Sequence, residues 1–198
     1  MEPNEVSLIN IVYQWGAGGQ FLSYLIAQHT IPCLDSAKKR PAKQTNDNEY
    51  LYTSYHPFLN RTHPELIKDF RALRSNKIIV IDCDSNEALL CRDFGIYKKD
   101  KEHLDDNRFP DDFEKLKSHL DLFKRKLDSA YDRFIIISYT DLFLLQKEDA
   151  IKKLFDFCCM TDIDYKSIAL QIKQYTETNL SNLKKHGINT SKYNIRSL

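Results

Sequence analysis

Apolar residues gather in short continuous runs that alternate with longer segments in which they recur every three or four positions. The short runs are typical of buried strands, and they cover residues 8–13, 77–81 and 134–139, with a further strand-like segment at 50–55. The helical spacing covers residues 20–29, 113–130, 151–158 and 168–175, and Pro64 suits the first turn of another helix. This alternation predicts a single α/β domain over residues 1–198, with three layers and a mainly parallel sheet.

A glycine-rich turn joins the first predicted strand to the first predicted helix. Three of the five glycines in the chain lie in Gly16-Ala17-Gly18-Gly19. Glycine lets the backbone approach a phosphate, and the N–H groups of a first helical turn favour negative charge. Gln20 and Phe21 follow, so the turn is not a Walker A loop, and the glycine spacing is not G-x-G-x-x-G. The turn predicts an anion site, and a connection whose glycines only allow close packing is the alternative.

The composition narrows the classes of partner. Positive and negative side chains nearly balance, at a formal net charge of +1, which argues against a dedicated nucleic-acid-binding protein. The apolar runs are much shorter than a membrane span, and the first residues lack the basic start and apolar core of a signal peptide. We therefore expect a cytoplasmic protein with no membrane and no nucleic-acid partner.

The cysteines and histidines lack the spacing of metal ligands. The five cysteines form no C-x-x-C pair, and the six histidines form no H-x-x-x-H pair. Four of the cysteines lie within or beside apolar runs, where a free thiol behaves as a small hydrophobic group. The sequence therefore predicts reduced structural thiols and no bound metal.

Polar residues that follow the predicted strands are the candidates for chemistry, because ligands of such sheets collect at the carboxyl ends of strands. His56 can remove the proton of an acceptor hydroxyl near neutral pH, although a histidine beside proline and aromatic residues also serves packing. Asp82 and Asp84 follow a buried strand. They either bind a cation, orient a substrate or cap the next helix.

Four segments, in this order along the chain, together resemble the P-loop sulfotransferase-like family. They are the glycine turn at 15–22, Thr53-Ser-Tyr-His-Pro57, the strand at 77–84 with the segment 87–94, and residues 137–142 with 151–157. The resemblance implies a P-loop NTPase-like domain and His56 as the catalytic base. It implies transfer of a sulfuryl group from 3′-phosphoadenosine 5′-phosphosulfate (PAPS), without a metal, to a hydroxyl or amine of a small-molecule or glycan acceptor.

The cofactor-binding residues that the resemblance implies come from the turn, the third strand and the late basic segment. They are Gly16, Ala17, Gly18, Gly19, Gln20, Phe21, Ser85, Arg92, Lys184 and Lys185. The turn lacks the lysine or arginine that stabilises charge on the transferring group in this family. Lys184 and Lys185 belong to a segment similar to the one that closes over the nucleotide, and they would supply the missing charge. A solvated terminus is the alternative.

Two further functions stay open. One is a degenerate member of the family that binds a nucleotide or phosphate without transfer chemistry. The other is a small kinase-like phosphotransferase, which would need magnesium, whereas sulfuryl transfer does not.

Overall fold

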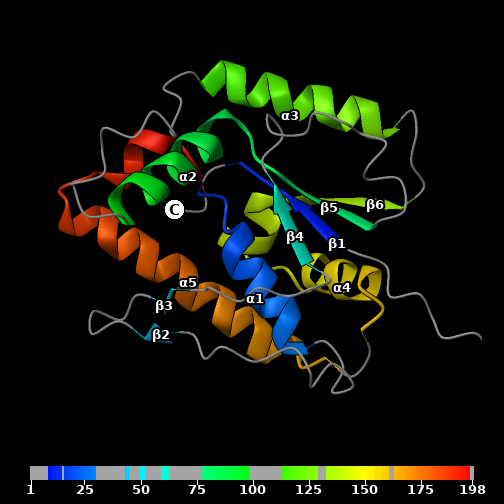
Figure 1. Cartoon of the computed structure of the whole chain (residues 1–198). Coiled ribbons are helices and arrows are strands. Elements are labelled where there is room, and N and C mark those ends of the chain that lie inside the picture. Colours follow the sequence, from blue (N-terminus) through cyan, green and yellow to red (C-terminus); the bar gives the residue numbers. More distant parts are fainter. Residues whose placement is uncertain are drawn as a thin grey trace, which may run out of the picture.

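A four-stranded parallel sheet in the order β4-β1-β5-β6 forms the centre of the computed structural model (Figure 1). The structure describes residues 9–14, 16–29, 43–44, 50–51, 59–62, 77–98, 113–128, 133–160 and 163–196. The strands of this sheet are β1 (Ile9–Val12), β4 (Leu59–Thr62), β5 (Lys77–Asp82) and β6 (Phe134–Ser138). Two short strands, β2 (Lys43–Gln44) and β3 (Tyr50–Leu51), form a separate antiparallel pair.

Helices cover both faces of the sheet, so the expectation of an α/β fold with a parallel sheet is confirmed (Figure 1). One face carries α3 (Phe113–Asp128), and the other carries α1 (Gly19–His29), α4 (Glu148–Phe157) and α5 (Tyr165–Lys185). The helix α2 (Ser85–Lys98) packs against both α3 and α5. The helix expected from Pro64 lies outside the described residues. No helix in the described part of the chain is both long and apolar enough to cross a membrane.

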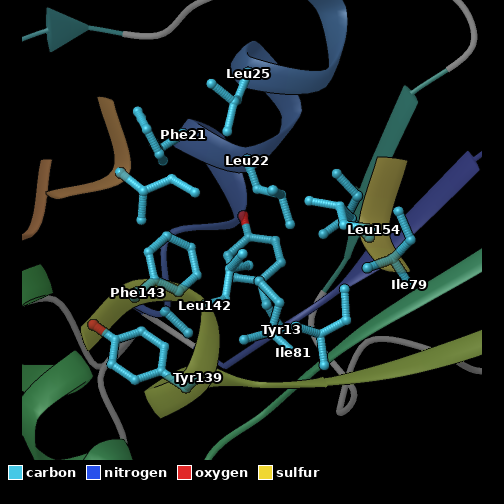
Figure 2. Packing of buried hydrophobic residues seen from close by; sticks show 14 of the residues in the cluster. Tyr13, Phe21, Leu22, Leu25, Ile79, Ile81, Tyr139, Leu142, Phe143 and Leu154 are labelled. Carbon is cyan, nitrogen blue, oxygen red and sulfur yellow. The ribbon is translucent and has the colours of Figure 1, made fainter. Parts of the chain in front are cut away.

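The two faces of the sheet build two cores of unequal size. Successive residues of a strand point to opposite faces, so Ile79 and Ile81 join the larger core and Ile78 and Val80 join the smaller one. Leu22 of α1 lies in the larger core, which Figure 2 shows from close by. Burial of one such aliphatic side chain contributes about 1.5–3 kcal/mol to folding. Packing on the sheet is therefore what holds the helices in place.

A single π-helical turn follows β6 and connects it to α4. This element, η5 (Thr140–Leu144), closes with a hydrogen bond from the Leu145 N–H to the Thr140 carbonyl oxygen, 2.9 Å long. The hydroxyl of Thr176 in α5 donates to the carbonyl oxygen of Phe143 over 2.9 Å. This hydrogen bond connects the π-turn to α5 and fixes the position of the Phe143 ring.

A buried aspartate ties the last described element to α2. Asp93 is buried, and its carboxylate accepts hydrogen bonds from the Tyr193 hydroxyl at 2.9 Å and the Lys192 ammonium at 2.7 Å. Both donors come from the short helix η6 (Thr190–Tyr193). The neighbouring Arg92 donates its Nε–H to the same carboxylate over 3.1 Å. This cluster holds the C-terminal segment on the middle of α2.

Candidate functional site

The carboxyl ends of β1 and β5 form the place in this sheet where a ligand is most expected. The chain runs from β1 to β4 on one side and then crosses to β5 on the other side of β1. The strand order therefore reverses between β1 and β5, and in open α/β sheets ligands bind outside the carboxyl ends at such a switch point. The glycine turn follows β1 here, and Cys83 and Asp84 follow β5.

The first two glycines of the turn pack directly against neighbouring elements. Gly16 has φ +78°, and a Cβ atom there would lie 1.6 Å from the carbonyl oxygen of Cys91 in α2. Gly18 has φ +77°, and its Cβ would lie 2.7 Å from the ring of Phe143. Only glycine adopts these left-handed conformations without strain and also leaves room for such neighbours. The close-packing interpretation therefore accounts for both residues.

The rest of the turn passes from the core to the surface. Ala17 and Gly19 are buried, and a Cβ at Gly19 would lie 2.2 Å from the ring of Tyr13. Gln20 is exposed. The side of the turn at Gly19 is thus filled by an aromatic side chain, and Gln20 marks the solvent-facing start of α1.

Phe21, which the resemblance assigns to the cofactor, belongs to an aromatic contact between α1 and α5. Its ring stacks on that of Tyr175, with the ring centres 4.3 Å apart and the planes 11° from parallel. The Tyr175 ring also lies 3.4 Å from the position of a Cβ on Gly18. A stacked aromatic pair contributes about 0.5–1.5 kcal/mol beyond the burial of its surface, so Phe21 stabilises the start of α1.

Titratable side chains are buried at the ends of β5 and β6, beside the turn. Tyr139 follows β6 directly, and its side chain is fully buried. Burial raises the pKa of Tyr139 and of Cys83 well above their ordinary values, and the neighbouring thiol of Cys91 raises both further. These two groups therefore stay neutral.

Gln14, two residues beyond the end of β1, is buried without hydrogen-bond partners for its side chain. Its side chain is 2% exposed, and neither its Oε1 nor its Nε2 has a hydrogen-bond partner. The pairing of β1 with β5 ends at Val12 and Val80, whereas Asp82 at the end of β5 pairs with Ser138 on β6. Asp82 and Ser138 therefore form a polar row at the ends of β5 and β6, and Gln14 lies two residues beyond the last paired residue of β1.

Asp82 in this row is engaged with α3. Its carboxylate lies 2.8 Å from the ammonium of Lys124, which also contacts Asp121 of the same helix at 3.1 Å. Burial alone would lower the pKa of Lys124, but the hydrogen bonds to the two carboxylates outweigh it and raise the pKa. Asp82 is therefore matched by a cation of the protein itself.

Asp84 caps α2, which confirms the capping interpretation of this acid. Its Oδ1 accepts a hydrogen bond from the N–H of Glu87 at 2.8 Å, and the Oε2 of Glu87 accepts one from the N–H of Asp84 at 2.7 Å. This reciprocal arrangement is a capping box, here with aspartate as the capping residue. The hydroxyl of Thr140 donates to the other oxygen of Glu87. Two carboxylates thus occupy the start of α2, where Ser85 is the first residue.

The free energy of unfolding should depend on pH through the buried carboxyl group of Glu87. Burial raises its pKa above the ordinary value of 4.5, although hydrogen bonds from Thr140 and Asp84 offset part of the effect. At pH values just above 4.5 this carboxyl group is then protonated to a greater extent in the native protein than in the unfolded chain, so its contribution to the free energy of unfolding falls as pH rises across this window and levels off above the native pKa. We expect Glu87→Gln to remove this fall in urea unfolding measured at several pH values.

The matched control for Glu87→Gln is Asp156→Asn, which changes an exposed acid on α4. It should leave the pH dependence as in the unaltered protein. If Glu87→Gln retains the full fall in unfolding free energy, the dependence comes from another group.

The basic residues that the resemblance assigns to the cofactor have other contacts or lie far along α5. Arg92 follows Cys91 and donates to the buried Asp93. Lys184 and Lys185 are exposed in the last turn of α5, about 14 Å along the helix axis beyond Tyr175 at 1.5 Å per residue. Cations at this end of a helix complement its dipole, which is a sufficient structural role for both lysines.

His56 and the segment 53–57 lie outside the described residues, as does Trp15. Within the described ranges, no group of three or more histidine, cysteine or acidic side chains is placed to hold a metal ion. Comparison with models of known protein families finds no match, and neither does comparison with curated protein sequences.

Proposed function

We propose that the protein binds a nucleotide or another small phosphate or sulfate ester at the carboxyl edge of the sheet, between β1 and β5. In this proposal it is a sulfotransferase-like P-loop protein that acts through binding and not through group transfer. The observation that carries the proposal is the buried amide of Gln14, which has no partner for either of its polar atoms.

A buried amide without hydrogen bonds is costly. Leaving a buried donor or acceptor unpaired costs about 1–3 kcal/mol, and native proteins pair nearly all such groups with protein atoms or water. Gln14 lies two residues beyond the end of the central strand β1, beside the switch point and two residues before the glycine turn. This location favours a ligand as the missing partner, and an amide suits the uncharged polar groups of a sugar or base because it both donates and accepts.

The start of α1 suits the anionic group of such a ligand. The N–H of Leu22 donates to the carbonyl oxygen of Gly18 at 2.8 Å, so Gly18 caps the helix and the next amides belong to its first turn. Amides of a first helical turn have no acceptor within the helix, and the helix dipole favours negative charge beside them. Gln20 is exposed at this end, which leaves the surface side of the turn open to an anion.

The charges around β5 favour a ligand with one anionic group over the bisphosphate nucleotide of PAPS. A 3′-phosphate beside Ser85 would meet the carboxylates of Asp84 and Glu87, which already satisfy the start of α2. Arg92, the nearest cation that the resemblance offers, is bonded to Asp93. Like charges in a partly buried site repel strongly, so we expect the second phosphate to weaken binding.

Sulfuryl transfer from PAPS, with His56 as base, is the second candidate function. The order of the four segments that resemble the family favours it. Enzymatic transfer would require a cation for the transferring group, and Lys184 and Lys185 are the candidates from the sequence.

Ligand binding should respond to Gln14 in a thermal-shift assay with AMP, adenosine 3′,5′-bisphosphate, inorganic sulfate, and ATP with magnesium. We expect AMP to raise the melting temperature, because ligands of the native state stabilise it, and the bisphosphate to bind no more tightly. Gln14→Leu should weaken AMP binding about tenfold, the equivalent of one hydrogen bond, while the melting temperature without ligand stays level or rises.

The control is Gln174→Leu, which changes an exposed glutamine on α5 and should bind AMP as the unaltered protein does. If Gln14→Leu also binds AMP normally, a buried water is the partner of Gln14. Bisphosphate binding at least tenfold tighter than AMP binding would favour sulfuryl transfer, and a requirement for ATP with magnesium would favour a phosphotransferase. No shift with any of the four probes would contradict the proposal.

A further inference from the structure

A lysine and an exposed cysteine form a close pair at the amino edge of the sheet, opposite the edge considered above. Lys77 is the first residue of β5, and its Nζ lies 2.9 Å from the Sγ of Cys159, which follows α4. The same ammonium donates to the carbonyl oxygen of Phe157 over 2.6 Å and lies 5.4 Å from the centre of the Phe157 ring. These contacts hold the positive charge beside the sulfur.

The backbone keeps the Cys159 thiol at the surface. Cys159 has φ +58°, and its N–H donates to the carbonyl oxygen of Asp156 at 2.9 Å. The next N–H, of Met160, donates to the carbonyl oxygen of Phe155 at 3.0 Å, and the Met160 side chain is buried. The left-handed conformation thus ends α4 with satisfied carbonyl groups, and it leaves the side chain of Cys159 exposed between two fixed neighbours.

We propose that Cys159 is a site of covalent modification, at which its sulfur, in contact with the ammonium of Lys77, is oxidised by hydrogen peroxide to a sulfenic acid. The thiolate is the nucleophilic form of cysteine, and an adjacent cation and access to solvent favour its reaction. The sulfur attacks one oxygen of the peroxide, an S–O bond forms and the O–O bond breaks. The departing hydroxide takes a proton to become water, so the sulfur is oxidised and the peroxide is reduced.

The adjacent cysteine provides an internal comparison. Cys158 is only partly accessible, and burial raises the pKa of its thiol to about 12 in spite of the nearby Lys77. Cys83 and Cys91 are buried. Among the described cysteines, Cys159 therefore combines solvent access with a cation in contact with the sulfur, and it should react first.

The test is a time course with hydrogen peroxide, in which dimedone traps sulfenic acid and mass spectrometry assigns it to each cysteine. In the folded protein we expect Cys159 to be trapped first and about tenfold faster than in Lys77→Met, because that variant removes the charge. Lys77→Arg should keep at least half of the rate, and Cys159→Ser should remove the adduct at this position. High salt should reduce the difference between the unaltered protein and Lys77→Met, because the pair is exposed.

A second comparison uses the unaltered protein alone and holds even if Lys77→Met fails to fold. In urea the contact with Lys77 is lost, so Cys159 should react more slowly in the unfolded chain than in the folded protein, and Cys158 should react faster. Equal rates at Cys159 in folded Lys77→Met and the unaltered protein would overturn the proposal. So would a native rate at Cys159 no higher than the rate in urea.

Discussion

Replacing Gly16 with alanine is expected to lower the free energy of unfolding by about 2–5 kcal/mol, which leaves the variant largely unfolded if the total stability is at the low end of the usual range. Two costs add up. A residue with a Cβ loses about 1–2 kcal/mol in the left-handed conformation, which Gly16 adopts at φ +78°. The new methyl group would also lie 1.6 Å from the carbonyl oxygen of Cys91, and overpacking of this kind costs about 1–3 kcal/mol. Urea unfolding followed by circular dichroism measures the total.

Gly187→Ala separates the two costs. Gly187 has φ +73°, but a Cβ there would meet nothing within 4 Å, so we expect a loss of about 1–2 kcal/mol from the conformation alone. The difference between the two variants then measures the close approach of the turn to α2. If both variants lose the same amount, Gly16 does not pack on Cys91 as described.

Removing the carboxylate of Asp93 is expected to cost about 3 kcal/mol of unfolding free energy. Asp93→Ala takes away the acceptor for Tyr193, Lys192 and Arg92, and hydrogen bonds to a buried charge contribute about 1.5–3 kcal/mol each. Lys192 is partly exposed and regains water, which keeps the total below the sum of the three. Limited proteolysis should also show that residues 190–196 are cleaved faster, because the contact of η6 with α2 is lost.

Two further variants serve as comparisons for Asp93→Ala. Tyr193→Phe removes one contact of the cluster, and Asp156→Ala is the control. Tyr193→Phe loses one hydrogen bond to Asp93 and should cost about 1.5–3 kcal/mol. Asp156→Ala changes an exposed aspartate, and substitutions of that kind usually stay within about 0.5 kcal/mol. A loss in Asp93→Ala no larger than that of Asp156→Ala would contradict the role given to this cluster.

Three strands of the sheet were predictable from the sequence because they are continuous apolar runs, whereas the short edge strand β4 (Leu59–Thr62) was not. Residues 77–81 and 134–139 lie within or beside β5 (Lys77–Asp82) and β6 (Phe134–Ser138), since β-branched side chains covered on both faces have few other stable arrangements. The helix α5 was only partly predicted, from 168–175, although it spans Tyr165–Lys185. Two of the buried positions in its second half, Thr176 and Asn179, are polar, so the apolar spacing that marks a helix fades there.

The sequence predicts contacts between residues that are close together in the chain, but it does not predict contacts between distant residues. The capping by Asp84 depends on a residue three positions away, a spacing that the sequence displays. The position of Phe143 on Gly18, and of Lys77 beside Cys159, joins residues far apart in the chain, and no local pattern specifies such pairs. Gln14 was missed as well. The signal available was a glutamine at the end of a buried strand, where an apolar residue is the usual choice.

The π-turn η5 makes the length of the connection between β6 and α4 depend on the presence of glycine at position 18. A π-turn holds one residue more than an α-turn, so a homologous protein with a single deletion between Ser138 and Glu148 would rebuild this turn as α-helix. Residues beyond the deletion would rotate by about 100° around the helix axis, and the Phe143 ring would leave Gly18, which it now contacts. A residue with a Cβ would then no longer meet the Phe143 ring, and the strain of the left-handed conformation would be the remaining cost at that position. In the evolution of this chain, the loss of Gly18 is therefore expected only together with the deletion.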